Sequence, residues 1–593
     1  MPDTVQDVLI ARIDRLAEDS RRAIQVASVI GREFALRLLA RITAAGERIR
    51  GQVEELRSLE LIYEKALHPE LAYMFKHALT HDVAYESVLL ERRTRLHRAI
   101  GGTIEELYAD RLAEHYETLA HHFSRGEDWE RALLYHERSA AKAAETHANR
   151  AVAHHCRQAL AIADRIAEQV SDDVRARLNE RLGLACFYLS EYIASAAAYE
   201  AAAAHSADAE TRAMYLSSAA FSHFWAHRYE SATRCIDAAG ALAEAEHLPA
   251  ATAMVKAVRG FAAAVHDADV PAYERSLQEA LAICADHPHA GVEGFARFQT
   301  ALAAEWSGSY EQAIERAQGA IALGRQLRRP EIIIFATWFL GKAHCCIGDY
   351  GAAIALLDDA YELCNRIGDR AWKSRMLNTL GWCFAEIGSV ERARDYNQRA
   401  AALAREIGDP EILSNADINL AMNHLALGER EHALALLEPI EATLARPGDP
   451  WMRWRYALHV HDARGAIELA RGAPDLTLVA AEAQLQGAQR YRVPKVEARA
   501  LTQRGAALLA LERGQEAEES LRAGAALAAR IGYLRGVWQA RRLLAEHARR
   551  VGDTATAAVH AAEARAAAER GAASLADDDL RRRLIASAVG GAD

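Results

Sequence analysis

Three consecutive segments repeat one pattern of small residues, and this repetition restricts the fold more than any other feature of the chain. Each segment has a first small residue, a glycine seven residues later and an alanine five residues after that. These positions are Gly341, Gly348 and Ala353, then Gly381, Gly388 and Ala393, then Ala421, Gly428 and Ala433. We call the first small residue the anchor. A small residue, a glycine turn and a second small residue predict one hairpin of two closely packed helices, and hairpins at a fixed period stack into a superhelix.

Equivalent anchors recur through most of the chain. They are Ala140, Gly183, Ala220, Gly260, Ala301, Gly341, Gly381, Ala421, Gly465, Gly505 and Ala545. From Ala220 onward the steps are 40 or 41 residues, except for one step of 44 that contains the sequence RPGDP at 446–450. We interpret these five residues as a loop insertion, because a repeat array tolerates extra residues between helices.

The period therefore predicts an all-α, superhelical, tetratricopeptide-like array of about eleven hairpins over residues 106–570. The usual tetratricopeptide period is about 34 residues, so we expect the same hairpins with longer helices. Residues 571–593 are expected to form a C-terminal cap and a frayed tail.

Residues 1–105 do not follow this period. Helical spacing of apolar residues predicts short helices over 5–16, 19–30, 34–42 and 49–59. The only clear β signal follows, with Glu60–Tyr63 and Leu71–Phe75 flanking a turn at His68–Pro69. Short helices followed by one β-hairpin predict a small winged-helix-like domain.

The same region resembles a known bacterial arrangement. The segments ARIDRL from Ala11, ASVIGREF from Ala27, FKHALTHDVAYESVL from Phe75 and RRTRLH from Arg92 carry the resemblance. They are similar to the region that follows the ATPase core in STAND-type signalling ATPases, including those fused to class III adenylate or guanylate cyclases. The resemblance covers about the first quarter of the chain. It implies a winged helix followed by tetratricopeptide-like repeats, and an ATPase core that would precede residue 1.

Composition and charge exclude several function classes. The net charge of −11 argues against a general binder of polyanions, because phosphate contacts require a basic surface. We find neither a signal peptide nor a stretch of about 18 apolar residues that would span a membrane. The eight cysteines include no CxxC pair, which predicts reduced, buried thiols and a cytoplasmic protein.

Catalytic signatures are missing from the sequence. There is no GxxxxGK[ST] phosphate-binding loop and no counterpart of the paired metal-binding aspartates of the cyclases. His77 and His81 are spaced i, i+4, but no HExxH motif accompanies them. We therefore expect no enzymatic activity, no cofactor and no metal site in this chain by itself.

Two sets of residues are candidates for binding. On the first helix of each hairpin, the residues three before and one after the anchor are expected to line the inner groove. In the best-formed repeats they are Trp338, Lys342, Asn378, Trp382, Ile418 and Met422. Such side chains suit an extended peptide or a partner helix, although Trp in repeat arrays more often fills the space between hairpins.

The second set is a basic face in the sequence ERRTRLHR, made of Arg92, Arg93, Arg95 and Arg98. It is suited either to DNA phosphates or to an ordinary solvated or docking helix face.

The sequence thus favours a non-catalytic signalling scaffold whose superhelix binds a protein or peptide and relays that state to an ATPase or cyclase module, in cis or in trans. Two alternatives stay open. The chain is a fragment of a multidomain cyclase–ATPase, or it is a DNA-binding regulator that uses the basic face. We expect no membrane partner, and the charge disfavours nucleic acid.

Overall fold

A computed structural model describes residues 5–66, 70–446, 448 and 452–589. The chain forms two compact units, unit 1 (residues 1–182) and unit 2 (residues 183–593), which we describe separately. This division lies beyond the predicted domain boundary at residue 105, because the helices that follow the N-terminal domain pack in the same unit.

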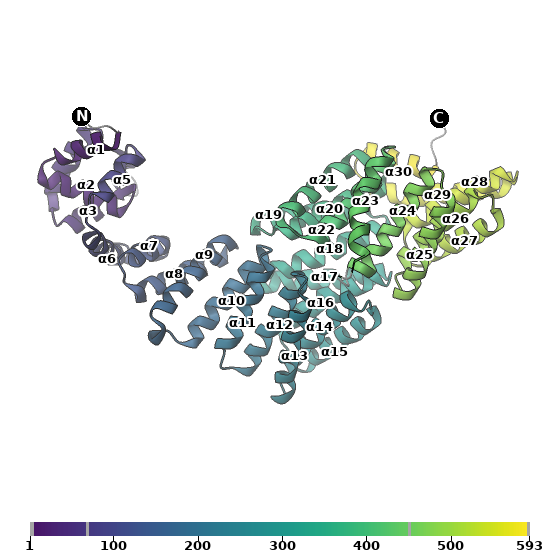
Figure 1. The fold of residues 1–593 in the computed structure, drawn as a ribbon, viewed down its shortest axis with the longest axis horizontal. Coiled ribbons are helices and arrows are strands. Elements are labelled where there is room, and N and C mark those ends of the chain that lie inside the picture. Colours follow the sequence, from purple (N-terminus) through teal and green to yellow (C-terminus); the bar gives the residue numbers. More distant parts are fainter. Residues whose placement is uncertain (1–4, 67–69, 447, 449–451, 590–593) are drawn as a thin grey trace. The chain divides into compact units, whose positions relative to one another are not determined.

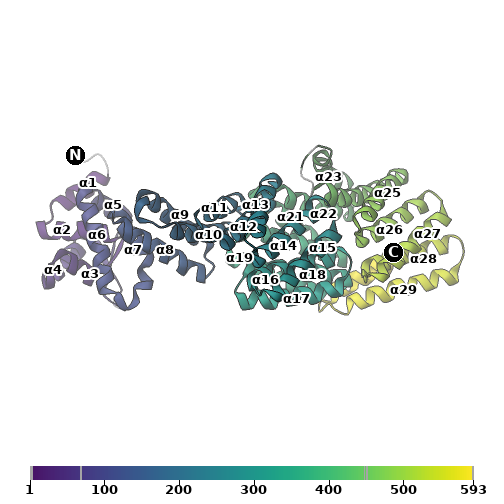
Figure 2. The ribbon, with the colours of Figure 1, turned by 90° about the horizontal axis from the view of Figure 1, so that it is seen from below.

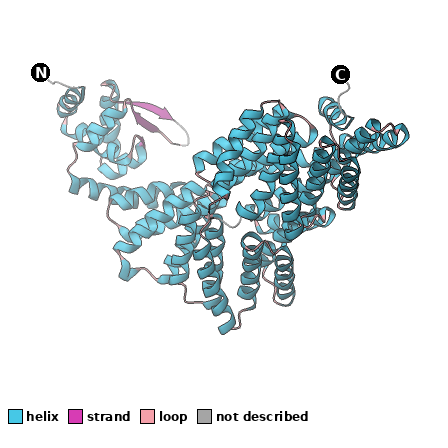
Figure 3. Ribbon diagram, turned by 45° about the vertical axis from the view of Figure 1, so that its right-hand side comes forward, coloured by secondary structure: helices cyan, strands magenta, loops and turns pink. Residues whose placement is uncertain are grey.

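Unit 1 begins with five short helices around a small sheet. The helices are α1 (Val5–Asp14), α2 (Glu18–Ile30), α3 (Leu36–Thr43), α4 (Ile49–Ser58), preceded by the 3₁₀ turn η1 (Gly46–Arg48), and α5 (Ala78–Glu86). The strands are β1 (Glu33–Ala35), β2 (Ile62–Ala66) and β3 (Ala72–Phe75), antiparallel in the order β1-β3-β2 (Figure 3).

The predicted β-hairpin is present as β2 and β3, but a third strand joins it. Phe34, which we expected at the start of a helix, lies in β1. It pairs with Tyr73 of β3 and is buried. A strand of three residues has no alternation long enough to detect, which explains the wrong prediction. The predicted turn residues His68 and Pro69 lie outside the described residues. The winged-helix assignment stays a prediction.

Unit 1 continues as a helical stack. Its further helices are α6 (Leu90–Leu107), η2 (Ala109–His115), α7 (Tyr116–Arg125), α8 (Trp129–Glu145), α9 (Asn149–Arg165), η3 (Ala167–Gln169) and the first part of α10 (Asp172–Tyr188). Two buried pairs of histidines join neighbouring helices. The Nδ1 atoms of His97 and His122 are 2.9 Å apart, and those of His136 and His155 are 3.0 Å apart.

Unit 2 contains the larger part of the repeat array, with helices stacked as antiparallel pairs (Figure 1). After α10, the first helices of the hairpins are α12 (Ala209–Trp225), α14 (Pro249–His266), α16 (Ala290–Trp306), α18 (Pro330–Ile347), α20 (Arg370–Ile387), α22 (Pro410–Ala426), α24 (Ala457–Ala470), α26 (Pro494–Ala510) and α28 (Leu534–Arg550). The second helices are α11 (Tyr192–His205), α13 (Tyr229–Ala245), α15 (Val270–Asp286), α17 (Tyr310–Leu327), α19 (Tyr350–Ile367), α21 (Val390–Ile407), α23 (Arg430–Leu444), α25 (Pro474–Tyr491), α27 (Gly514–Arg530) and α29 (Thr554–Ala572). A π-helical turn, η4 (Met452–Tyr456), precedes α24, and α30 (Asp578–Val589) ends the described chain.

The predicted period is confirmed. Within the described residues, α8–α29 form eleven hairpins, and each anchor lies in the first helix of its hairpin. A Cβ added at Gly341 would lie 2.8 Å from Leu357 of the second helix, so the helices approach as closely as a glycine allows. Gly348 and Gly388 end the first helices with φ of 87° and 88°, a left-handed conformation that favours glycine. The predicted insertion at 446–450 falls largely outside the described residues.

The C-terminal helices return to the middle of the array instead of continuing away from it. Helix α28 packs against α18, and α30 packs against α20. Figure 2 shows these yellow helices beside the teal helices of residues 310–347. Part of the predicted frayed tail is therefore the packed helix α30, whose Leu580 and Leu584 are buried in one cluster with Cys345 and Cys383.

Helix α18 is long and apolar enough to cross a membrane, although it contains the charged residues Glu331 and Lys342. By length and composition alone it passes that test, with a mean hydropathy of 1.2. In the structure 72% of this window is buried inside the protein, as in the core helix of a repeat array.

Replacing Asn397 by leucine is expected to stabilise unit 2. Asn397 is fully buried beside the anchor Gly381, and neither atom of its amide has a hydrogen-bond partner among the described residues. Leu357 and Leu437 occupy the equivalent position in the adjacent repeats. Because an unsatisfied buried amide costs roughly 1–3 kcal/mol, Asn397→Leu should raise the free energy of unfolding by about that amount in urea denaturation.

The matched control for this substitution is Gly381→Ala. It adds a methyl group against Asn397 in the same contact and should destabilise by about 1–3 kcal/mol through overpacking. Equal or lower stability of Asn397→Leu would show that the amide is not a liability in this repeat.

The buried histidines make unit 1 sensitive to acid. Burial, together with His121 and Arg125, lowers the pKa of His97 to about 3. Burial, together with His155 and His154, lowers the pKa of His136 to about 4. In an unfolded chain both imidazoles would have a pKa of about 6.5. The unfolded state therefore binds more protons than the folded state, and stability falls as the pH falls below about 6.5.

Acidification from about pH 7.5 to about pH 5 is expected to cost about 2 kcal/mol for each of His97 and His136. Hydrogen exchange of the α6–α9 amides, corrected for intrinsic rates, measures this loss. His136→Phe should weaken the pH dependence, whereas His432→Ala, at an exposed position of α23, should leave it unchanged. Equal protection of the α6–α9 amides at both pH values would contradict the predicted loss of stability on protonation of the buried histidines.

Candidate functional site: a polar cavity in unit 2

A cavity of about 210 Å³ lies inside unit 2. In the described part of the chain, its wall is built by seven first helices, α16, α18, α20, α22, α24, α26 and α28, together with η4. The first helix of each hairpin faces the axis of the superhelix, so consecutive repeats present their side chains to one space. The return of α28 to α18 brings the late repeats opposite the early ones.

All six residues of the predicted groove line this one cavity. They are Trp338, Lys342, Asn378, Trp382, Ile418 and Met422. The positions three residues before and one residue after the anchor therefore form part of the cavity wall. Whether these side chains bind a partner stays a prediction.

The remaining wall of the cavity was not predicted. It is formed by side chains of η4, α24, α26 and α28, among them Arg455, Asp462, Lys495, Arg499 and Arg535. Asp462 lies three residues before the anchor Gly465, so the same rule would have found it. Arg455, Lys495 and Arg535 each lie ten residues before an anchor, a position that the rule did not include. Arg499 lies six residues before Gly505.

The two predicted tryptophans have structural partners as well as a place in the wall. Trp338 is largely buried and its Nε1 donates to Thr379 Oγ1 at 2.6 Å. Trp382 Nε1 donates to Glu386 Oε1 at 3.1 Å. Each ring also carries an ammonium group over its face, with Lys342 Nζ 4.8 Å from the centroid of Trp338 and Lys495 Nζ 4.1 Å from that of Trp382. The indoles thus hold two lysines at the cavity.

Lys342 and Glu305 form a buried ion pair in the wall. Their Nζ and Oε2 atoms are 2.8 Å apart, and their side chains are 11% and 5% exposed. Burial raises the pKa of Glu305, but the nearby ammonium groups of Lys342 and Lys495 outweigh it and lower the pKa overall. Burial lowers the pKa of Lys342, and Glu305 opposes this. The short contact between the two groups supports an ionised pair.

The cavity wall has more positive than negative side chains. Lys342, Arg455, Lys495, Arg499 and Arg535 face the carboxylates of Glu305, Glu386 and Asp462. Arg499 pairs with Asp462, and Arg535 Nη1 lies 3.5 Å from Glu386 Oε1. Lys495 has no carboxylate within 4.0 Å among the described residues, and its Nζ contacts the Cys346 sulfur at 3.3 Å. Burial keeps the pKa of His459 well below its usual value, so its ring adds no charge near neutral pH.

Four asparagines of α20 and α22 add amide groups to the same wall. They are Asn378, Asn415, Asn419 and Asn423. Asn419 Nδ2 donates to Asn378 Oδ1 at 3.0 Å. Asn423 is buried, and its Nδ2 has no hydrogen-bond partner among the described residues. A side-chain amide offers both a donor and an acceptor, which is the pattern that a peptide group can satisfy.

An aromatic compartment of about 50 Å³ adjoins the polar cavity and shares Trp306, Trp338 and Arg455 with it. Its wall includes Phe335 and Trp372, whose ring centroids are 4.1 Å apart. The combined site offers charged and amide groups on one side and aromatic surface on the other, as small-ligand and peptide sites commonly do.

The predicted basic face lies on α6 in unit 1, whereas the residues of the cavity belong to unit 2. The guanidinium of Arg98 makes a hydrogen bond within unit 1. Its Nη2 donates to the carbonyl of Gly126, at the end of α7, at 2.8 Å. Arg93 lies over the Tyr85 ring at 4.8 Å, and Arg95 lies 3.9 Å from Glu91. Arg92 is half-buried. Arg93 and Arg98 thus make contacts within unit 1, and the binding of this face to DNA stays a prediction.

Comparison with known proteins agrees with the repeat architecture. The family model described as tetratricopeptide repeat matches residues 333–406. No curated protein sequence matches the chain.

Several solved structures are distantly similar. A Rap protein complexed with Competence and Sporulation Factor is 10% identical, with 60% of this chain and 98% of that chain covered and a TM-score of 0.48. NprR in complex with its cognate peptide NprX is 13% identical, with 56% and 97% covered and a TM-score of 0.39. A STAND protein with a tetratricopeptide repeat sensor from Pyrococcus horikoshii is 11% identical, with 84% and 67% covered and a TM-score of 0.35. The chain is an all-α, tetratricopeptide-like repeat array with a small N-terminal, three-stranded antiparallel sheet.

Proposed function

We propose that this chain binds a short, extended peptide with an acidic group in the cavity of unit 2, and that it acts as a non-catalytic signalling adaptor. The observation that carries the proposal is the convergence of seven first helices on one cavity whose wall has five cationic and three carboxylate side chains. Arg455 Nη1 lies 3.8 Å from Glu411 Oε1, outside the cavity wall, so a free or side-chain carboxylate of a ligand would chiefly balance Lys495.

The asparagines support a peptide over other anions. Asn423 has an unpartnered, buried Nδ2, and a peptide carbonyl is the acceptor that would satisfy it. Asn378 and Asn419 are already paired with each other, so they would hold the wall in place and bind with their remaining groups. Side-chain amides on neighbouring helices recognise the backbone of an extended chain without fixing its sequence.

The neighbouring compartment supports an apolar residue in the same peptide. Its aromatic wall and volume of about 50 Å³ suit one small apolar side chain next to the carboxylate. The polar cavity of about 210 Å³ is also small, so only a few residues would enter and the rest of the partner would stay outside. We therefore propose that the ligand is a chain end or a short exposed segment, not a folded surface.

Lys495, which has no carboxylate within 4.0 Å among the described residues, provides the sharpest test of the peptide site. Fluorescence titration or calorimetry with short peptides should show tighter binding of acidic peptides with a free C-terminus than of their amidated, uncharged counterparts. Lys495→Met should weaken binding at least about 30-fold, because truncating one partner of a buried charge pair costs roughly 2 kcal/mol or more. Asn423→Ala should weaken the binding of acidic and neutral peptides by the same factor.

The matched control is Lys256→Met on α14, which removes an ammonium group outside the cavity that is paired with Glu279. It should leave peptide affinity unchanged. If acidic and amidated peptides bind equally, or if Lys256→Met and Lys495→Met have the same effect, the cavity is not a carboxylate-binding peptide site.

We further propose that the bound state is relayed to an ATPase or cyclase module, in cis or in trans. The support is the sequence resemblance of residues 11–97 to the region that follows the core of STAND-type ATPases. Affinity capture with the full chain, followed by mass spectrometry, should recover a protein with a phosphate-binding loop or a class III cyclase domain. Capture should depend on whether the cavity is occupied by peptide. Recovery of duplex DNA-binding activity with a steep salt dependence, in place of such a partner, would favour a regulator instead.

A further inference from the structure

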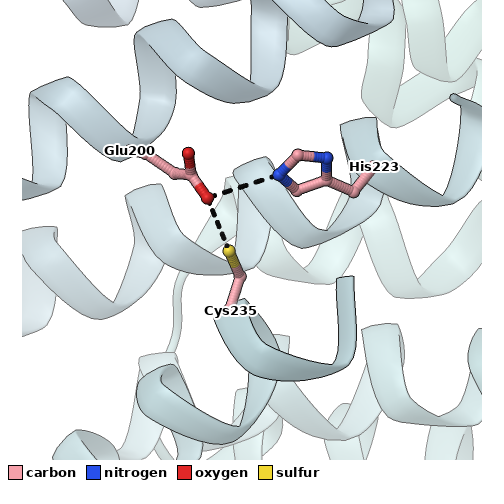
Figure 4. A group of neighbouring side chains, drawn as sticks. All are labelled: Glu200, His223 and Cys235. Atoms are coloured by element: carbon pink, nitrogen blue, oxygen red, sulfur yellow. Dashed lines mark hydrogen bonds and ion pairs between the residues drawn. The ribbon is translucent and has the colours of Figure 1, made fainter. Parts of the chain in front are cut away.

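Three side chains with metal-binding atoms meet outside the peptide cavity in unit 2. Glu200 lies on α11, His223 on α12 and Cys235 on α13, so each comes from a different helix (Figure 4). Figure 4 shows the imidazole and the thiol both directed at the Glu200 carboxylate. None of the three lines the polar cavity or its aromatic neighbour.

The spacing of the three atoms fits a tetrahedral ion. Glu200 Oε1 is 3.3 Å from His223 Nε2 and 3.1 Å from Cys235 Sγ, and the ligand atoms all lie within 4.8 Å of one another. At zinc bond lengths of about 2.0–2.3 Å, neighbouring ligands of a tetrahedral site are separated by roughly 3.3–3.6 Å. The cluster therefore needs only small side-chain movements to surround an ion.

The types of atom narrow the choice of metal. One imidazole nitrogen, one sulfur and one carboxylate oxygen suit zinc, whereas magnesium and calcium prefer sites made of oxygen alone. The Glu200 side chain is 38% exposed, while that of His223 is 9% exposed. The cluster thus has a buried side and an open side, where water can complete the coordination.

In the absence of an ion, a proton on the thiol competes with a metal for the sulfur. Burial and the hydrogen bond to Glu200 raise the pKa of Cys235 to about 12, so the sulfur carries a proton near neutral pH. Burial opposes the charge on Glu200, but the hydrogen bonds from Cys235 and His223 outweigh it and lower its pKa. Binding of a divalent cation would replace the thiol proton, which is released to solvent.

Two neighbours set limits on affinity. His223 Nδ1 is buried and has no hydrogen-bond partner among the described residues, whereas strong zinc sites usually fix this second nitrogen with an acceptor. Arg234 Nη2 lies 3.8 Å from Glu200 Oε1 and competes for the carboxylate, but its side chain is 69% exposed and can turn to solvent. Both features favour a reversible site over a permanent one.

We propose that Glu200, His223 and Cys235 form a reversible zinc site that links two adjacent hairpins. Glu200 belongs to the hairpin of α10 and α11, and the other two ligands belong to the hairpin of α12 and α13. An ion bound here cross-links the stack at its junction, as a regulatory or stabilising clamp. The proposal does not depend on peptide binding in the cavity.

The test uses the full, metal-free chain with Co²⁺ as a spectroscopic substitute for Zn²⁺. One equivalent should give a thiolate-to-cobalt charge-transfer band and the visible bands of a tetrahedral site, and Zn²⁺ should abolish both. Glu200→Gln, at the exposed ligand, should fold normally and weaken binding at least tenfold. Cys235→Ala should remove the charge-transfer band. Zn²⁺ should also raise the Tm of the wild type but not of these two variants.

Two controls separate this cluster from other histidines and cysteines. Cys284→Ala removes another buried thiol, and His432→Ala removes a histidine from a second group formed with His424 and Glu429. Both variants should retain the band and the Zn²⁺-dependent rise in Tm. Absence of the charge-transfer band in the wild type, or its persistence in Cys235→Ala, would overturn the proposal.

Discussion

The close approach of two helices at a small anchor residue is the contact on which the rest of unit 2 depends. At Gly341 a single additional methyl group would meet Leu357 of the paired helix, so the separation of the two helices is set by the absence of a side chain. A small residue, glycine or alanine, occupies the anchor position in every repeat, so each hairpin can pack its two helices closely. Once the hairpins stack, the first helices face one axis, and the side chains near the anchors necessarily meet there. The cavity is thus a geometric result of helix packing.

Much of this arrangement was predictable because a repeat converts spacing along the chain into position in space. The anchors, the glycine turns and the six groove residues around Trp338 and Trp382 all follow from one periodic rule. Other features were missed. Strand β1 has only three residues, too few to show an alternation. Lys495 and Arg535 each lie ten residues before an anchor, a position that the rule did not include. The proposed zinc ligands Glu200, His223 and Cys235 have unequal spacings and form no motif.

Electrostatics distinguish the cavity from the packing that surrounds it. The first helices bury mainly alanine, leucine and aromatic side chains, whereas five cations and three carboxylates line this one cavity. Buried ions are costly unless each has a partner, and the indoles of Trp338 and Trp382 help by placing aromatic faces beside two ammonium groups. Charged side chains in the wall lower the stability of the fold, because their burial costs free energy. Such costly charges are typical of sites that recognise a ligand.

The contact of α28 with α18, and of α30 with α20, changes the mechanics of the array. An open solenoid behaves like a spring, because each repeat touches only its neighbours and can stretch or fray independently. Here α28 contacts α18, which lies five hairpins earlier in the chain. The contacts between the hairpins of unit 2 therefore form a closed ring. Pulling or loosening one hairpin must strain others on the far side of the cavity. We expect such a ring to unfold in one concerted step and to resist elongation that an open array would tolerate.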